Sequence, residues 1–155
     1  MENIKLKSLT KENAKDYLEM INEEPENSKV RDFAIGLYVT SEKDFNDLLD
    51  EYALRNNQFL GIFKEDKLIG ALCSQNMYFD NSHEVGFFIR KSERGHHYAS
   101  QALALFLQKA KELNIKNIML AIDKRNNASL KVANFVGAKY SHDYEEDEEI
   151  HTLEL

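Results

Sequence analysis

The sequence EVGFFIRKSERGHHYASQALALF, from Glu84 to Phe106, decides the fold of this chain. It begins as an apolar, strand-like run, passes through a short basic loop around Gly95, and continues with apolar residues at helical spacing. The first N–H groups of a helix have no acceptor inside the helix, so together with the helix dipole they attract an anion. The sequence therefore predicts an anion site at the amides from Gly95 to Ser100, with Arg94 as an additional cation. An ordinary turn before a helix can have the same composition, and residues 94–97 alone do not separate the two interpretations.

Strand-like runs precede this junction. Residues 58–90, QFLGIFKEDKLIGALCSQNMYFDNSHEVGFFIR, contain three such runs separated by polar segments typical of hairpin turns, which predicts an antiparallel meander. Nearer the N-terminus, IKLKSL (4–9) alternates like a half-buried strand, and a helix is predicted to follow from Thr10. Residues 25–33 form a loop or a short helix, and residues 41–54 recover helical spacing.

The chain after the junction alternates between helix and strand. We predict a helix from about Ala99 to Leu113 and a second helix from about Ala128 to Val136. Between them IMLAI (118–122) lacks polar alternation, so we expect a strand covered on both faces, parallel to EVGFFI. Two strands should end the chain, with the acidic DYEEDEE (143–149) as their solvated turn. No repeat or linker interrupts the pattern, so we expect one α/β (α+β) domain over residues 1–155.

The composition limits the partners of this domain. A net charge of −7 disfavours a nucleic-acid backbone as the main ligand, and no apolar run approaches the length that crosses a bilayer. The single cysteine, Cys73, cannot form an internal disulfide and lies in an apolar run typical of a buried thiol. We therefore expect a cytoplasmic monomer or homodimer that binds neither nucleic acid nor membrane.

The order of motifs from Glu84 to Tyr140, closing with DKRNNASLKVANFVGAKY (123–140), resembles the GNAT superfamily of acyl-CoA-dependent N-acetyltransferases. In pattern it is most similar to the branch that acetylates ribosomal-protein N-termini or small amines. The resemblance implies a mixed, centrally splayed sheet of about six to seven strands flanked by about four helices. It also implies acetyl-CoA as cosubstrate.

The resemblance assigns the cofactor site to specific positions. The family loop Arg/Gln-x-x-Gly-x-Gly/Ala corresponds to Arg94–Ala99, with His97 in place of the central glycine. Gly86 would mark the bulge that splays the central strands, and Asn126 would contact the cofactor arm, although an asparagine there can simply cap the helix. The implied cofactor-binding residues are Phe87, Phe88, Ile89, Arg94, Gly95, His96, His97, Tyr98, Ala99, Ser100, Asn126 and Ser129.

For catalysis, we expect Glu84 to take the proton of the incoming amine. Only one of His83 and Glu84 can face the cleft, because side chains alternate along a strand. The family's tyrosine that protonates the leaving thiolate corresponds to Ala133 here, so that role is vacant or filled elsewhere. We expect no metal, since adjacent histidines on a turn point apart and no third ligand is spaced nearby.

The sequence therefore favours an N-acetyltransferase that moves acetyl from acetyl-CoA to a primary amine by direct attack in a ternary complex. The acceptor would be a small-molecule or peptide amine. His97 and Ala133 keep an alternative open, a catalytically weak CoA-binding or sensor module of the same fold. A plain interaction domain is a third possibility, and it predicts no binding of CoA.

Overall fold

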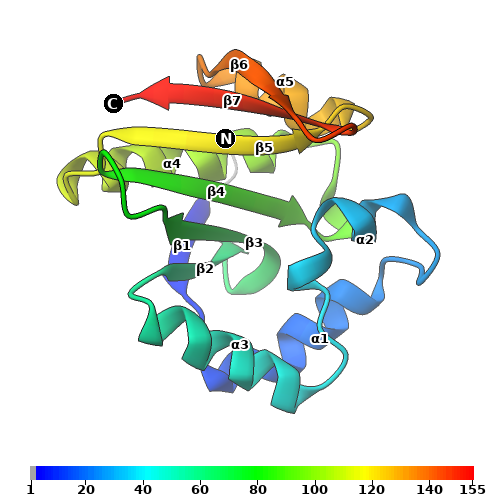
Figure 1. Ribbon diagram of the computed structural model, residues 1–155. Coiled ribbons are helices and arrows are strands. Elements are labelled where there is room, and N and C mark those ends of the chain that lie inside the picture. The colour runs from blue at the N-terminus through cyan, green and yellow to red at the C-terminus, as the bar shows by residue number, and fades with distance from the viewer. Residues whose placement is uncertain (1–2) are drawn as a thin grey trace.

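The computed structural model describes residues 3–155. They form one mixed seven-stranded sheet in the order β1-β2-β3-β4-β5-β7-β6, with helices on both faces (Figure 1). The strands are β1 (Ile4–Ser8), β2 (Gln58–Lys64), β3 (Lys67–Asn76), β4 (Ser82–Ile89), β5 (Asn117–Asp123), β6 (Lys139–Tyr144) and β7 (Glu148–Glu154). The α-helices are α1 (Ala14–Asn22), α2 (Lys29–Phe33), α3 (Glu42–Leu54), α4 (Tyr98–Glu112) and α5 (Asn127–Phe135). Short 3-10 turns lie at η1 (Lys11–Asn13), η2 (Ile35–Leu37) and η3 (Lys91–Glu93).

This architecture confirms the predicted fold class, the antiparallel meander and the terminal hairpin. The meander is β2-β3-β4, and β6 pairs with β7 in antiparallel fashion. The short α2 is the helix beyond the four that were expected, and it lies in the stretch interpreted as a loop or a short helix. In Figure 1, α2 lies beside the C-terminal end of β4.

The two faces of the sheet bury different sets of side chains. On one face, α4 supplies Leu103 and Phe106 to a core that includes Leu72 and Leu120. On the other face, α1 and α3 cover β2 and β3 with an aromatic cluster, in which the Tyr17 and Phe45 rings lie 4.7 Å apart. Successive strand residues alternate between these cores, as the pleat of a strand requires. Strands β2 and β3, which precede β4 in the sheet, are therefore packed on both faces.

The centre of the sheet is splayed. β4 and β5 run parallel but pair only at their first residues, Ser82–Glu84 against Asn117–Met119, and then separate. The β3–β4 register continues without a shift through Gly86, so the expected bulge at that glycine is wrong. The backbone groups of β4 beyond Glu84 that face β5 are consequently left without a strand partner.

The pattern of β5 also differs from expectation. Ile118, Leu120 and Ile122 are buried, whereas Met119 and Ala121 are only half-buried, so the strand is not covered equally on both faces. The reason is the splay, since Ala121 lines the open space beside β4 instead of packing against a helix. The uninterrupted apolar sequence thus reflects one packed face and one face at a cavity.

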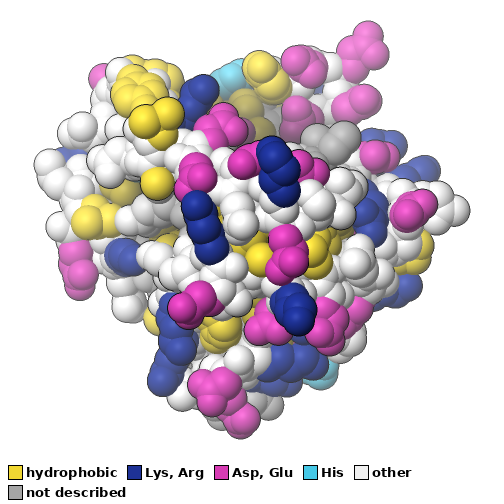
Figure 2. Space-filling model, turned by 90° about the horizontal axis from the view of Figure 1, so that it is seen from below, with side chains coloured by type: hydrophobic (Ala, Val, Ile, Leu, Met, Phe, Trp, Pro, Cys, Tyr) yellow, Lys and Arg dark blue, Asp and Glu magenta, His cyan; other side chains and the backbone are white. Residues whose placement is uncertain are grey.

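The outer surface carries mixed charge. Seen from below the view of Figure 1, lysine and arginine side chains are interspersed with aspartate and glutamate side chains (Figure 2). Within residues 3–155, none of the helices is both long and apolar enough to span a bilayer.

Candidate active site

A cavity of about 1520 Å³ opens where β4 and β5 separate. Its walls come from β4, β5, the loop before α4, the start of α5, α2, α3 and the turn between β6 and β7. Segments that are far apart in the sequence, and that were predicted to contribute to the site, thus line the same cavity. The sequence-predicted site residues lie along this cavity with one exception, His96, whose ring instead lies 5.4 Å from that of Tyr98.

The loop before α4 leaves its amides free. Gly95 has φ +87° and His97 has φ +64°, both in the left-handed region, and His97 is the N-cap of α4. None of the backbone N–H groups from Gly95 to Ser100 donates a hydrogen bond within residues 3–155. Two left-handed residues in so short a loop turn the chain so that α4 begins at Tyr98 with its N-terminus at the cavity. The left-handed backbone at His97 gives a physical reason for the family's glycine at this position.

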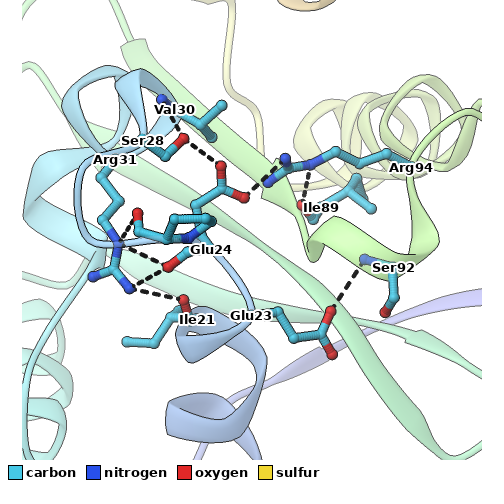
Figure 3. A network of polar contacts seen from close by, with 10 residues as sticks. Ile21, Glu23, Glu24, Ser28, Val30, Arg31, Ile89, Ser92 and Arg94 are labelled. Atoms are coloured by element: carbon cyan, nitrogen blue, oxygen red, sulfur yellow. Dashed lines mark hydrogen bonds and ion pairs between the residues drawn. The ribbon is translucent and has the colours of Figure 1, made fainter.

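The guanidinium of Arg94 is not a free cation in this structure. Its Nε donates to the carbonyl of Ile89 at 2.9 Å, and its Nη1 lies 3.0 Å from Oε2 of Glu24, at the C-terminal side of α1 (Figure 3). Glu24 is buried, and its second carboxylate oxygen accepts a hydrogen bond from the Ser28 hydroxyl. Arg94 therefore lines the cavity but has its charge already compensated.

A second glutamate fixes the same loop from the same side. Glu23 accepts hydrogen bonds from Nε of Arg90 at 2.8 Å and from the backbone N–H of Ser92 at 3.1 Å. Arg90 is buried and also donates to the carbonyl of Leu68. Burial alone would raise the pKa of Glu23, but the hydrogen bonds from Arg90 and Ser92 outweigh it and lower the pKa to about 2.

The opposite side of the loop is held by Glu93. Its carboxylate accepts from Lys64 at 2.9 Å and from Lys67 at 3.2 Å, both at the turn between β2 and β3. These hydrogen bonds, acting against burial, lower the pKa of Glu93. The backbone from residue 90 to residue 97 is thus anchored on two sides, which holds its free amides in a fixed direction.

The three residues of β4 that the sequence predicts to bind the cofactor, Phe87, Phe88 and Ile89, divide between the two faces of the sheet. Phe88 packs in the aromatic cluster with Tyr38, at a ring separation of 5.3 Å, while Ile89 belongs to the α4 core. Phe87 is only partly buried, and all three residues line the cavity. Their common feature is the backbone edge of β4, which faces the gap left by β5.

Asn126 is the N-cap of α5. Its side-chain oxygen accepts from the backbone N–H of Ser129 at 3.2 Å, which is the capping role left open by the sequence. The amide nitrogen of Asn126 donates no hydrogen bond within residues 3–155, and both residues line the cavity. The cap therefore leaves the amide nitrogen of Asn126 available to a ligand in the cavity.

Glu84 lies where β4 and β5 begin to diverge, and it lines the cavity. Burial raises its pKa above the ordinary glutamate value. His83 points to the other face, where its Nδ1 is 2.9 Å from the Ser74 hydroxyl, as the alternation of the strand predicts. A carboxylate with a raised pKa in a cleft is suited to accept a proton near neutral pH.

Two residues missed by sequence reasoning lie beside Glu84. Tyr52 of α3 lines the cavity, and its hydroxyl accepts from the Gln75 amide at 2.9 Å. Cys73 also lines the cavity, with its thiol 3.7 Å from the Gly86 carbonyl, and burial raises the pKa of both groups. No spacing signal connects α3 to β3, so the sequence offered no indication of Tyr52. Ala133, the position of the family tyrosine, is fully buried.

The part of the cavity lined by α2, α3 and the β6–β7 turn is acidic. Burial raises the pKa of Glu148, and the charges of Glu145, Asp123 and Glu84 raise it further. By contrast, a hydrogen bond from Arg125 lowers the pKa of Asp123. Among the described residues, no group of three or more histidine, cysteine, aspartate or glutamate side chains is arranged to hold a metal ion. The carboxylates lining the cavity are Asp32, Glu51, Glu84, Glu93, Asp123, Glu145, Glu146, Asp147 and Glu148.

A family model for the acetyltransferase (GNAT) domain matches residues 3–139. The chain therefore belongs to the GNAT acetyltransferase family, as the resemblance implied. A sequence comparison with curated proteins found no significant match.

Solved structures of acetyltransferases share the whole fold. The ribosomal-protein-S5-alanine acetyltransferase from Vibrio fischeri is 17% identical with a TM-score of 0.76, covering 99% of this chain and 94% of its own. Mycobacterium smegmatis RimJ, solved with CoA-disulfide, is 15% identical with a TM-score of 0.81 over 97% of this chain and 81% of its own. The microcin C7 self-immunity acetyltransferase MccE, solved with acetyl-CoA and AMP, is 14% identical with a TM-score of 0.82 over 100% of this chain and 94% of its own. At these identities the likeness shows the fold.

Proposed function

We propose that this chain is an N-acetyltransferase that transfers acetyl from acetyl-CoA to a cationic primary amine. The observation that carries the proposal is the cavity between β4 and β5, with free helix N-terminal amides at one end and Glu84 at the other. Residues 1–155 would act as a single domain in the cytoplasm, which suits a chain whose only cysteine is a buried free thiol.

Acetyl-CoA fits the two kinds of wall that the cavity offers. The amides from Gly95 to Ser100 and the α4 dipole suit a pyrophosphate, and the unpaired edge of β4 suits the amide groups of a pantetheine arm. Structures of similar fold, RimJ and MccE, were solved with CoA-disulfide and acetyl-CoA. With the pyrophosphate at the loop, the arm would run along β4 and place the thioester near the point where β4 and β5 meet.

The reaction requires a deprotonated amine beside the thioester. A primary amine with a pKa of about 10 is almost fully protonated at neutral pH, so a base must take its proton before nitrogen attacks the carbonyl carbon. Glu84 lies at the divergence of the strands and its raised pKa makes it a stronger base than an exposed glutamate. When the tetrahedral intermediate collapses, the carbon–sulfur bond breaks and the thiolate takes up a proton from water; Tyr52 lines the same cavity, but its raised pKa makes it a weak acid for this step.

The charge of the acceptor side supports a cationic amine. Carboxylates from α2, α3 and the β6–β7 turn line this part of the cavity, and the two arginine side chains of the cavity, Arg94 and Arg125, already have carboxylate partners. The mutual repulsion that raises the pKa of Glu148 would be relieved by a positive ligand. A peptide N-terminus or a small polyamine meets this requirement, and the fold similarity to a ribosomal-protein acetyltransferase keeps the peptide in consideration.

One observation favours a second candidate, a CoA-binding sensor with weak turnover. Ala133 is fully buried, so the family's proton-donating tyrosine has no counterpart at that position. Such a module would bind CoA in the same cavity without releasing thiol when amines are added.

The two candidates separate in an amine panel with a free-thiol readout. Acetyl-CoA is supplied together with spermidine, a peptide with a free N-terminus, or glutamate as an anionic amine. The proposal expects thiol release with the cationic amines and little with glutamate, and mass spectrometry should place the acetyl group on nitrogen. Thermal stabilisation by CoA without turnover of any amine would favour the sensor, and the absence of stabilisation would contradict both.

A matched pair of variants tests the acceptor side. Glu148→Gln removes a carboxylate from the cavity, and Glu154→Gln makes the same change at an exposed position on the same strand. Glu148→Gln should raise KM for spermidine by about threefold to tenfold, while Glu154→Gln leaves it unchanged. Equal effects of the two variants would show that overall charge, and not the cavity wall, attracts the amine.

A further inference from the structure

The segment after α1 is bound to the proposed cofactor loop through Glu24 and Arg94. These residues are far apart in sequence, yet Nη1 of Arg94 lies 3.0 Å from Oε2 of Glu24 (Figure 3). Glu24 is only 4% exposed, and its Oε2 accepts no hydrogen bond within the described residues, so the ion pair with Arg94 is the polar contact of this oxygen. Because a buried carboxylate without a partner is costly, Arg94 is held at Glu24 in the protein without ligand.

Arg94 also belongs to the loop whose amides face the cavity. It immediately precedes Gly95, and its guanidinium lines the same cavity. A pyrophosphate at the amides from Gly95 to Ser100 would bring further negative charge next to this guanidinium. Two anions, Glu24 and the pyrophosphate, would then share one cation, and the carboxylate would also repel the pyrophosphate.

Glu24 further connects the loop to the acceptor side of the cavity. Arg31 donates to the carbonyls of Ile21, Glu24 and Pro25, and its guanidinium lies 4.9 Å from the centre of the Tyr38 ring. The stretch from Val30 to Leu37 begins beside these contacts and lines the same cavity. A change at Glu24 is therefore transmitted to a wall of the acceptor side.

We propose that Glu24 is a positioning residue that competes with the cofactor's pyrophosphate for Arg94, so that cofactor binding loosens the wall formed by residues 28–37. The inference rests on the proposed function, because it requires CoA at this loop. Glu24 lies outside the family motif. It would control how tightly CoA binds and when the wall formed by residues 28–37 loosens.

The test compares CoA affinity with stability in Glu24→Gln. Calorimetry should show CoA binding about threefold to tenfold tighter than in the wild type, because the competing charge is gone. Thermal denaturation without ligand should show a lower Tm, because a buried ion pair is lost. A residue with a purely structural role would lower both affinity and Tm.

Three variants complete this comparison. Glu26→Gln makes the same charge change at an exposed position, and Ser28→Ala removes the hydroxyl that holds Glu24 without changing charge. Neither should tighten CoA binding. Arg94→Gln should weaken CoA binding, and in this background Glu24→Gln should have at most half of its effect on log Kd, because the cation in dispute is absent. A full effect of Glu24→Gln without Arg94 would overturn the proposal.

Hydrogen exchange of the wild type supplies a measurement that needs no variant. On addition of CoA, amides of residues 95–100 should exchange more slowly, and those of residues 28–37 should exchange faster. If residues 28–37 become slower or do not change while CoA protects the loop, the inference fails and the proposed function stands. If CoA protects nothing and calorimetry detects no binding, the proposed function fails together with the inference.

Discussion

The two ends of the cavity are built from different chemistry. At the cofactor end the groups that face the ligand are mainly backbone amides and strand edges, held in place by ion pairs behind them. At the acceptor end they are side chains from α2, α3 and the β6–β7 turn, and several of them are carboxylates. Backbone groups can be directed by a short motif, whereas side chains from separate elements come together only in the folded chain.

The specificity for the acceptor can therefore change independently of cofactor binding. A substitution at the acceptor end alters charge and shape without moving the backbone that receives the cofactor. At the cofactor end, a substitution acts through the backbone and so affects stability together with CoA binding.

Removing the base should have the largest effect. Glu84→Gln keeps the shape of the side chain and should lower kcat by about 10²–10⁴-fold while leaving CoA affinity unchanged. In the wild type the rate should rise with pH through the raised pKa of Glu84, because the deprotonated carboxylate is the active form, and this acidic limb should vanish in the variant. Steady-state kinetics across pH and calorimetry with CoA check both parts. Near-normal turnover of Glu84→Gln would show that another group takes the proton of the amine.

Breaking the ion pair behind the cofactor loop should be the next largest effect. Arg90→Ala removes the partner of Glu23 and a donor to the Leu68 carbonyl, so unfolding free energy should fall by about 3–5 kcal/mol and CoA affinity should fall with it. Lys43→Ala, which removes an exposed pair with Asp47, is the control and should change stability little. Denaturant melts measure the stability of the two variants, and calorimetry measures their CoA affinity. A stable Arg90→Ala variant that keeps full CoA affinity would contradict the anchoring of the loop.

The same pair predicts loss of stability in acid. The pKa of Glu23 is lowered to about 2 in the folded protein, so its contribution is present above the unfolded pKa of about 4.5. It is lost as pH falls from about 4.5 towards 2, because protonation is easier in the unfolded chain. Melts between pH 6 and pH 2.5 should show a smaller decline for Glu23→Gln than for the wild type. An equal decline would exclude Glu23 as a source of acid sensitivity.

Asn126 allows its two roles to be separated. Asn126→Ala should cost about 1 kcal/mol of stability through loss of the α5 cap, whereas Asn126→Ser should restore most of it. If the amide nitrogen contacts the cofactor, both variants should bind CoA about tenfold more weakly, since neither supplies it. Recovery of CoA affinity in Asn126→Ser would reduce Asn126 to a helix cap.

The left-handed residues of the loop should give the smallest effect. His97→Gly relieves a backbone conformation that favours glycine and should raise stability by up to about 1 kcal/mol. Gly95→Ala introduces the opposite strain at φ +87° and should lower stability by about 1 kcal/mol, although a new Cβ there meets no atom within 4 Å. Denaturant melts of the two variants test whether stability rises in His97→Gly and falls in Gly95→Ala. Loss of stability in His97→Gly would show that the ring itself contributes to the loop.

Much of the fold follows from local sequence patterns. The meander, α4, α5 and the terminal hairpin were predicted because each is encoded by periodicity and turn residues close in sequence. The splay of the sheet was expected from the family, but its assignment to a bulge at Gly86 was wrong, since β3 and β4 stay in register there. The exposed face of β5 could not be predicted, because apolar residues beside a cavity resemble apolar residues in a core.

Apart from Glu84, the candidate site was predictable only at the proposed cofactor end. The free amides before α4 and the cap at Asn126 arise within a few residues and have sequence signals. The pairing of Arg94 with Glu24 joins segments that only tertiary packing brings together, so the sequence alone predicts Arg94 as a cation that faces the ligand. Tyr52 was missed for the same reason, since nothing in the spacing of α3 indicates which of its residues face β3.

The limited pairing of β4 with β5 also divides the chain in a simple way. Strands β1 to β4 come from residues 4–89, and β5 to β7 from residues 117–154, so the sheet consists of two blocks that are continuous in sequence. One connection, through α4, joins them. Two copies that exchanged their β5–β7 blocks would keep every strand pairing, and two fragments cut after α4 would retain a complete block each. The architecture that opens the cleft thus also permits domain swapping and fragment complementation.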